Sequence, residues 1–387
     1  MERDLDQRNK DAGIRAQEAG FAAGGGLARG PRDSLRAPFD EWASTVGNTG
    51  ELILTVAIAG VSHRVVVKSE WENPTGSMKD RTALGLLSGA LQRGQLGMGL
   101  RIIESTSGNL GIALAHATTH MGIGLVLVTD PRFPSCKRER LYGYDVEIDE
   151  VVTHDEYGSY LPARRSRVIE RLLSDNRLIW LNQYENDHNP TIHHDTTAKE
   201  LLGSPTVEKI DRVYVPVSTG GTYAGIRKRF RAVSPLTKVI GVDVLGSRAF
   251  GGDPGSRRFV GIGSARRSSY IPENSELGPY YHELVSEEKS VAVANWLVGQ
   301  GIRPFGMSTA VAIAACIGHI RRASGPQSIY CIGADSGYDY LETLYDERWL
   351  SIMGFDFKKL QAELRRTAHD ESWGVRAVTE KMSDAAC

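Results

Sequence analysis

Asn73-Pro74-Thr75-Gly76-Ser77-Met78-Lys79-Asp80-Arg81 is the stretch that determines the expected fold. It follows a strand-like run at 64–68, and its first residues, at 73–77, favour a turn. A helical run follows at 82–87. Lys79 therefore lies where a strand ends and a helix begins, which is where open α/β sheets bind ligands. A desolvated lysine there can lose its proton and form a Schiff base with a carbonyl. Taken alone, the charged triplet that begins at Lys79 is more simply an exposed, charge-paired turn.

Short β-rich runs alternate with amphipathic runs along most of the chain. This alternation is typical of mostly parallel sheets flanked by helices, so we expect an α/β fold with two domains. The expected strands are 52–58, 64–68, 101–103, 124–129, 146–148, 178–181, 212–217, 238–244 and 328–332. The expected helices are 80–93, 109–121, 135–142, 162–174, 191–202, 223–232, 287–298 and 308–323.

The expected domain organisation has four parts. They are a mobile N-terminal extension at 1–36, an N-terminal α/β domain at 39–181, a C-terminal α/β domain at 182–345 and a C-terminal tail at 346–387. The first 36 residues mix charges with Ala and Gly and show no sustained hydrophobic period. Residues 246–279 are rich in Gly, Ser, Pro and Arg, and we expect a surface excursion that could serve as a lid or a subunit contact.

The composition excludes several classes of protein. In 387 residues, 46 Lys and Arg balance 47 Asp and Glu, so no general basic field attracts nucleic acid or anionic lipid. No apolar run approaches the ~18 residues of a membrane span, and the N-terminus does not resemble a secretory signal. The four cysteines are scattered without metal-ligand spacing. We therefore expect a cytoplasmic protein with reduced thiols and no metal.

A second polar stretch is Glu104-Ser105-Thr106-Ser107-Gly108-Asn109-Leu110-Gly111, between an expected strand and an expected helix. Backbone N–H groups and hydroxyls at such a helix start can converge on an anion such as a carboxylate. A helix cap by Ser107 or Asn109 is the simpler interpretation. A cap requires only one such residue, however, and here small polar residues stand in succession.

A third stretch is Val217-Ser218-Thr219-Gly220-Gly221-Thr222-Tyr223-Ala224-Gly225, again between a strand and a helix. Two glycines and a threonine at a helix start offer N–H donors suited to a phosphate monoester, although such a turn can be purely structural. The glycines match neither the G-x-x-x-x-G-K-[ST] nor the G-x-G-x-x-G pattern, so a dinucleotide is not expected.

A fourth stretch, Cys331-Ile332-Gly333-Ala334-Asp335-Ser336-Gly337-Tyr338-Asp339-Tyr340-Leu341, ends a strand in an acid and a hydroxyl. Ser336 could cap the following turn or face a heteroaromatic nitrogen, and the residues alone do not separate these roles. Pyridoxal phosphate requires four features of a protein: a reactive lysine, an anion-binding loop, a phosphate-binding loop and a polar side chain beside its ring. The four stretches together could supply them.

These motifs resemble those of the fold type II pyridoxal-phosphate family, which includes cysteine synthase, cystathionine β-synthase and threonine synthase. The resemblance runs from Val46-Gly47-Asn48-Thr49 to Leu341. It implies a homodimer with pyridoxal phosphate, with Lys79 as the Schiff-base lysine, Asn109 bonded to the pyridoxal hydroxyl and Ser336 facing the pyridine nitrogen. It also implies a phosphate loop of Ser218, Thr219, Gly220, Gly221 and Thr222, and a substrate-carboxylate site of Thr106, Ser107, Gly108 and Gln183.

Within the family, residues 179–184, 241–247 and 260–264 resemble the synthases of 2,3-diaminopropionate pathways. That resemblance implies β-replacement on O-phospho-L-serine through an aminoacrylate, with L-glutamate as the nucleophile, toward siderophores or peptide natural products. A phosphate leaving group would require cationic partners, for which Arg132, Lys137 and Arg303 are candidates, although exposed basic residues are the simpler interpretation.

Two departures leave the substrate open. Leu110 replaces the threonine usual in cysteine synthases, and Gly306-Met307-Ser308-Thr309-Ala310 departs from the usual Ser-Ser-Gly-Ala. The alternatives are a cysteine or cystathionine synthase with a sulfur nucleophile, a dehydratase, and a catalytically silent regulatory homologue.

Overall fold

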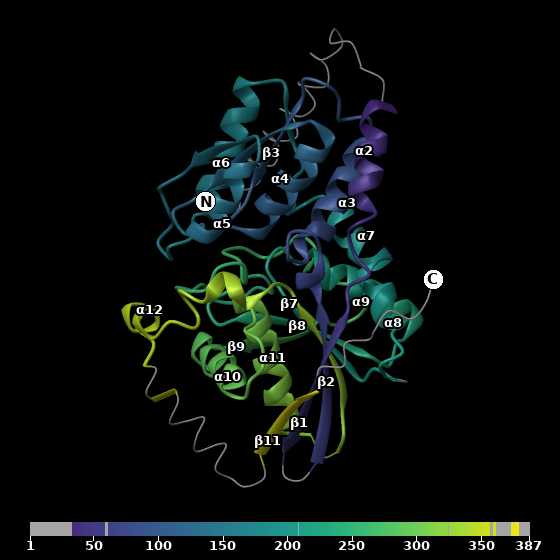
Figure 1. The fold of residues 1–387 in the computed structure, drawn as a ribbon, viewed down its shortest axis with the longest axis vertical. Coiled ribbons are helices and arrows are strands. Elements are labelled where there is room, and N and C mark those ends of the chain that lie inside the picture. The colour runs from purple at the N-terminus through teal and green to yellow at the C-terminus, as the bar shows by residue number, and fades with distance from the viewer. Residues whose placement is uncertain are drawn as a thin grey trace. The chain divides into compact units, whose positions relative to one another are not determined.

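A computed structural model describes residues 33–58, 61–207, 209–323, 325–356, 359–360 and 373–378. The chain forms two compact units (Figure 1). The first unit contains Met1–Val46 and Lys79–Asn189, and the second contains Gly47–Met78 and Pro190–Cys387.

The first unit is built on a four-stranded parallel sheet with the strand order β5-β4-β3-β6. Its strands are β3 (Arg101–Ser105), β4 (Gly124–Thr129), β5 (Val146–Glu150) and β6 (Leu178–Trp180). Its helices are α2 (Asp33–Ala43), α3 (Lys79–Gln92), α4 (Asn109–Met121), α5 (Ser135–Glu139), η3 (Arg140–Gly143) and α6 (Leu161–Ser174).

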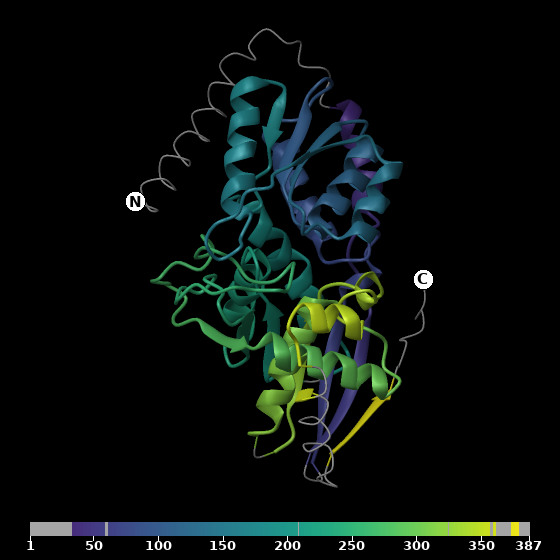
Figure 2. The same cartoon turned by 90° about the vertical axis from the view of Figure 1, so that its left-hand side faces the viewer.

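Successive residues of a strand point to opposite faces of the sheet, and consecutive residues here are apolar, so both faces are apolar. Ile102 and Leu125 pack in a buried cluster with residues of α2, α3 and α4. Their neighbours Ile103 and Val126 pack in a separate cluster with α6. The sheet accordingly lies between α6 and the other three helices (Figure 2).

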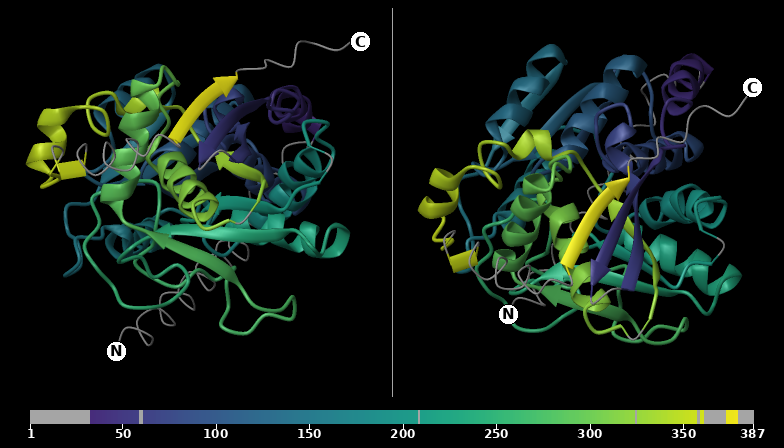
Figure 3. Two further views of the ribbon diagram at one scale, coloured as in Figure 1. Left: turned by 90° about the horizontal axis from the view of Figure 1, so that it is seen from below. Right: turned by 60° about the horizontal axis from the view of Figure 1, so that its bottom comes forward.

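The second unit is built on a seven-stranded sheet with the order β11-β1-β2-β10-β7-β8-β9. Its strands are β1 (Glu51–Ile58), β2 (Val61–Ser69), β7 (Arg212–Pro216), β8 (Lys238–Val244), β9 (Tyr281–Val285), β10 (Ser328–Gly333) and β11 (Trp373–Val378). The strands from β2 to β9 in this order are parallel, whereas β1 pairs antiparallel with both β2 and β11 (Figure 3).

Helices cover both faces of the second sheet as well. They are α8 (Thr197–Leu202), α9 (Gly221–Val233), α10 (Glu287–Gly299), α11 (Met307–Ile320) and α12 (Glu347–Ile352), with short turns η2 (Glu70–Glu72) and η4 (Gly337–Tyr340). Val65 and Val67 pack with α10 and α11, while Val66 between them packs with α8 and α9. Helix α7 (His188–Asp195) spans the boundary between the units.

The two units differ from the expected domains at one large segment. The sequence predicts residues 47–78 in the N-terminal domain at 39–181, but they lie in the second unit. The reason is that β2 pairs with β10, a strand more than two hundred residues later in the chain. The segment 182–189, predicted in the C-terminal domain, lies in the first unit.

Several local expectations also require correction. Helix α2 begins at Asp33, inside the expected extension, and Leu35 is buried, whereas residues 1–32 lie outside the described part. The expected helix at 191–202 is two helices that meet at Thr196. The expected tail contributes α12 and the edge strand β11. The excursion at 246–279 is not all surface, because it buries Phe259 and Ile271.

Among the described helices, none combines the length and the apolar character that crossing a bilayer would require. In the same described residues, no three His, Cys, Asp or Glu side chains are grouped so that they could hold a metal ion.

Candidate active site

Lys79 is the first residue of α3, and the preceding segment is anchored to the end of β10. Ser77 forms a β-bridge with Asp335, and the Met78 N–H donates to the Ala334 carbonyl at 2.8 Å. The peptide link therefore places the lysine directly after a residue that is fixed at the carboxyl end of a parallel strand. Lys79 follows a strand and opens a helix, as the sequence predicts.

The electrostatic surroundings of Lys79 favour a reactive amine. Burial lowers the pKa of Lys79 to about 8, and the negative charge of Glu104 partly opposes this shift. Glu104 is fully buried near the end of β3, and its Oε1 accepts from the Ser105 N–H at 3.0 Å and Trp180 Nε1 at 3.4 Å. Burial raises the pKa of Glu104 to about 7, against these hydrogen bonds. A neutral lysine is the nucleophilic form, so near-neutral pH supports Schiff-base formation.

Thr106 shapes the loop between β3 and α4. Its Oγ1 accepts from the N–H groups of Gly108 and Gly111, each at 3.2 Å, and its own N–H donates to the Val128 carbonyl. A Cβ at Gly111 would lie 2.8 Å from Thr106 Cγ2, so this close packing requires glycine. Neither Ser107 nor Asn109 supplies the side-chain cap that the simpler interpretation of the sequence offers.

Ser107 stands apart from Thr106 in its contacts. Its side chain is half-buried, and across the described part of the chain its hydroxyl makes no hydrogen bond to protein. The loop therefore combines one threonine that holds its shape with one serine whose hydroxyl remains available to a ligand.

Gln183, which follows β6, supports the same loop. Its side-chain Nε2 donates to the Ser105 backbone carbonyl at 2.8 Å, and the Gln183 backbone carbonyl accepts from Asn189 Nδ2 at 2.7 Å. The side chain is buried. The sequence predicts a substrate-binding role, and the geometry adds that Gln183 fixes the position of the loop.

Lys137, in the first unit, lies in an environment that differs from the sequence-based interpretation. An exposed basic side chain is the simpler expectation from the sequence, but Lys137 is only 2% exposed. It lies on α5, and its Nζ donates to Asn109 Oδ1. No pattern in the sequence around Lys137 predicts this contact.

In the second unit, the predicted phosphate loop forms the N-terminus of α9. The first amides of an α-helix lack intrahelical acceptors, so they can bind an anion there. Gly220 has φ of 93°, and a Cβ on it would lie 2.3 Å from Ser268 Oγ. That hydroxyl donates to the Thr219 carbonyl at 2.5 Å. Only glycine therefore fits at position 220, and Ser268 from the excursion braces the loop.

The hydroxyls of the loop are held by protein partners. Thr222 Oγ1 and His193 Nε2 lie 3.1 Å apart, and His193 Nδ1 lies 2.9 Å from Thr197 Oγ1. Ser218 Oγ donates to the Gly263 carbonyl at 3.3 Å. Because His193 and Ser268 stand outside any recognisable motif, the sequence does not single them out.

Ser336 caps the turn η4 at the end of β10. Its Oγ accepts hydrogen bonds from the Tyr338 N–H and from Arg303 Nη2, both at 3.3 Å. The Arg303 guanidinium stacks over the Trp71 ring at 4.3 Å, which fixes its direction. Both sequence-based roles of Ser336 are compatible with this geometry, because the hydroxyl hydrogen is left for a further acceptor.

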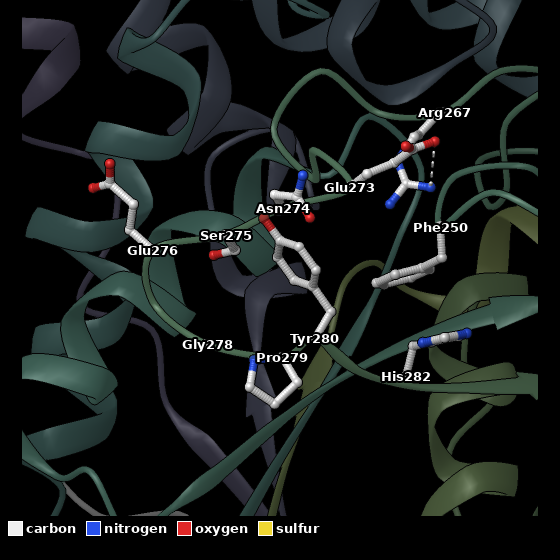
Figure 4. A pocket seen from close by; sticks show the side chains of 10 residues that line it. All are labelled: Phe250, Arg267, Glu273, Asn274, Ser275, Glu276, Gly278, Pro279, Tyr280 and His282. Atoms are coloured by element: carbon white, nitrogen blue, oxygen red, sulfur yellow. Dashed lines mark ion pairs between the residues drawn. The ribbon is translucent and has the colours of Figure 1, made fainter.

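A separate cavity of about 890 Å³ lies beside the excursion in the second unit (Figure 4). Phe250 and His282 stack with centroids 4.5 Å apart, and Arg267 pairs with Glu273 at 4.0 Å. None of the predicted site residues lines this cavity. Lys79, the 106–109 loop and Gln183 belong to the first unit, whereas the 218–222 loop and Ser336 belong to the second.

Comparison with known proteins identifies the family. Residues 51–332 match the family described as pyridoxal-phosphate dependent enzyme. The chain is 34% identical over 312 residues to the N-(2-amino-2-carboxyethyl)-L-glutamate synthase of Ralstonia nicotianae, covering 79% of this chain and 89% of that protein. It is also 34% identical over 314 residues to the synthase of the same name from Cupriavidus metallidurans, covering 79% and 90%.

A solved structure shows the same fold. The hydrogen sulfide-producing enzyme of Fusobacterium nucleatum aligns with a TM-score of 0.70 and 25% identity, covering 78% of this chain and 99% of that one. The predicted α/β fold and the predicted cofactor, pyridoxal phosphate, are thereby confirmed. The chain belongs to the pyridoxal-phosphate-dependent enzymes, in the fold type II group that contains the cysteine synthases.

Proposed function

We propose that this pyridoxal-phosphate-dependent β-substituting synthase replaces the phosphate of O-phospho-L-serine with the amine of L-glutamate. The observation that carries the proposal is the 34% identity to two N-(2-amino-2-carboxyethyl)-L-glutamate synthases over most of each chain. The product would be a precursor of 2,3-diaminopropionate, for siderophores or peptide natural products.

Each unit carries residues whose chemistry suits the cofactor. Lys79 supplies an amine of lowered pKa for the cofactor aldehyde. The amides of 219–222 supply donors for the phosphate, and Gly220 leaves no Cβ in their way. Asn109 can bond the pyridoxal hydroxyl, and the Ser336 hydroxyl can face the ring nitrogen. When bound, the cofactor supplies an electron sink for the substrate carbanion.

The protein groups have distinct tasks in this proposal. Lys79 would hold the cofactor through its amine and would remove and return the proton at the substrate Cα. Ser107 and the amides of the Thr106–Asn109 loop bind the substrate carboxylate. Gln183 holds that loop in position through the Ser105 carbonyl.

A sulfur nucleophile is the second candidate. The structural likeness to a hydrogen sulfide-producing enzyme supports it, because that enzyme shares the fold over 78% of this chain. A cysteine or cystathionine synthase would accept sulfide or homocysteine in place of glutamate. A catalytically silent homologue would bind the cofactor and turn over none of these substrates.

Mass spectrometry of products separates the candidates. The purified holoenzyme is incubated with O-phospho-L-serine or O-acetyl-L-serine, each combined with L-glutamate, sulfide or L-homocysteine. We expect N-(2-amino-2-carboxyethyl)-L-glutamate from phosphoserine plus glutamate, and none from Lys79→Ala. Exclusive formation of cysteine or cystathionine would overturn the proposal in favour of the sulfur alternative.

We also propose that the protein is a cytoplasmic homodimer, because the family resemblance implies it. Analytical ultracentrifugation of the holoenzyme tests the oligomeric state. A monomer at concentrations well above those of the assay would contradict the dimer.

A further inference from the structure

The contact between Lys137 and Asn109 links a buried charge to the expected cofactor partner. Lys137 Nζ donates to Asn109 Oδ1. The lysine stem runs beside Gly108, where a Cβ would lie 3.8 Å from Lys137 Cδ, in ordinary van der Waals contact. Helix α5 is fixed locally, since the N–H groups of Lys137 and Arg138 both donate to the Pro134 carbonyl. The ammonium is therefore held against the Ser-Gly-Asn loop.

The chemistry of the two groups fixes the direction of the Asn109 amide. A lysine ammonium carries three donors and no acceptor, so only the oxygen of the amide can face it. The Nδ2 group consequently points away from Lys137, as a donor. Without the ammonium, this constraint on the direction of the amide oxygen is lost.

Burial of Lys137 suggests a role beyond packing. Lysine is almost never fully buried unless its charge has a partner, because desolvation of an ammonium is costly. At 2% exposure, a methionine would fill the same space without that cost. The polar contact with Asn109 is therefore a better reason for a lysine at this position than packing is.

We propose that Lys137 is a positioning residue that orients the Asn109 amide, so that Nδ2 donates to the phenolic oxygen of the cofactor and keeps that oxygen deprotonated. This inference rests on the proposed assignment of Asn109 as the partner of the pyridoxal hydroxyl. It does not depend on which amino acid is the donor or the nucleophile.

Two spectroscopic readouts test the role without any turnover. They are the dissociation constant of pyridoxal phosphate for the apoenzyme and the ratio of visible to near-ultraviolet absorption of the holoenzyme at one fixed pH. For Lys137→Met we expect an affinity lower by about tenfold, as when a residue that orients a ligand-binding group is lost. We also expect a lower visible fraction, because protonation of the phenolic oxygen moves its absorption to shorter wavelength. Lys137→Arg, which keeps the charge and the donors, should recover most of both.

A double-mutant cycle separates positioning from packing. If Lys137 acts through Asn109, Lys137→Met should change neither readout when it is added to Asn109→Ala. Wild-type values for Lys137→Met, or equal effects in both backgrounds, would overturn the proposal. Lys137→Gln replaces Lys137→Met in the cycle if the latter does not fold. A wild-type protein that binds the cofactor normally but makes no glutamate adduct would refute the proposed function and leave this inference standing.

Discussion

The hydroxyl oxygen of Ser336 lies 3.3 Å from Nη2 of Arg303 and accepts a hydrogen bond from it. The same oxygen accepts from the Tyr338 N–H, also at 3.3 Å. A serine hydroxyl has two lone pairs and one hydrogen, so both acceptor sites are used and only the donor remains. Arg303 thus prepares Ser336 to donate to an acceptor such as a pyridine nitrogen.

Loss of the Ser336 hydroxyl should weaken cofactor binding while the protein remains folded. Ser336→Ala removes the donor and the cap of a short turn, which costs about 1 kcal/mol of stability. We expect the affinity for pyridoxal phosphate, measured by fluorescence titration of the apoenzyme, to fall several-fold. Ser336→Thr keeps the hydroxyl and serves as the matched control. Unchanged affinity in Ser336→Ala would exclude a contact to the cofactor.

Thr106 should matter for stability. Thr106→Val keeps the shape of the side chain but leaves the buried Gly108 N–H without its acceptor, and the Gly111 N–H keeps only its second acceptor, the Gly108 carbonyl. An unsatisfied buried donor costs about 1–3 kcal/mol, so the urea midpoint of unfolding should fall clearly. Thr106→Ser, which retains the acceptor, should lose less. Equal stability of the valine variant and the wild type would show that these hydrogen bonds contribute little.

Ser107 should behave in the opposite way. Its hydroxyl makes no protein hydrogen bond across the described residues, so Ser107→Ala should leave the unfolding midpoint within about 0.5 kcal/mol of the wild type. If the hydroxyl binds the substrate carboxylate, KM for the amino-acid donor should rise about tenfold. A variant with unchanged KM would remove Ser107 from the substrate site.

Much of the architecture could be predicted because the strands are apolar on both faces. Val65, Val66 and Val67 show this directly, since alternate residues pack with different helix layers. The exposed residues of β9, such as Tyr281 and Leu284, give no comparable signal. The pairing of β2 with β10 also escapes prediction, because register between strands so distant in sequence is not encoded locally.

The candidate site shows the same division. The residues that belong to motifs, such as Lys79 and Gly220, stand at the starts of helices, and the motifs single them out in the sequence. The supporting residues, such as His193 and Lys137, reach the site from other helices. Their side chains carry no local pattern, so only the folded structure brings them to the loops that they hold.

Reconstitution of the apoenzyme should report the lowered pKa of Lys79. Imine formation requires the unprotonated amine, and burial lowers the pKa of this lysine to about 8 from its usual value near 10.5. The rate of recovery of visible absorption after addition of pyridoxal phosphate should therefore rise with pH, with a midpoint near 8. Lys79→Arg is the control that forms no imine. A midpoint above 10 would contradict the environment described for Lys79.

Glu104 should make the apoenzyme less stable as pH rises through neutrality. Burial raises the pKa of this carboxyl to about 7 from 4.5, so the folded state keeps a proton that the unfolded state loses. The resulting stabilisation is complete below pH 4.5 and is lost as pH rises through about 7. Glu104→Gln retains acceptors for the Ser105 N–H and Trp180 Nε1 without the charge, so urea unfolding should show a variant more stable than wild type at pH 8, by on the order of 2 kcal/mol. The difference should vanish near pH 4.5.

Because the charge of Glu104 raises the pKa of Lys79, the same variant should also move the reconstitution midpoint to lower pH. Parallel stability profiles for the two proteins would show that Glu104 is already ionised without cost in the folded protein, and a midpoint that moves upward would contradict the attraction between Glu104 and Lys79.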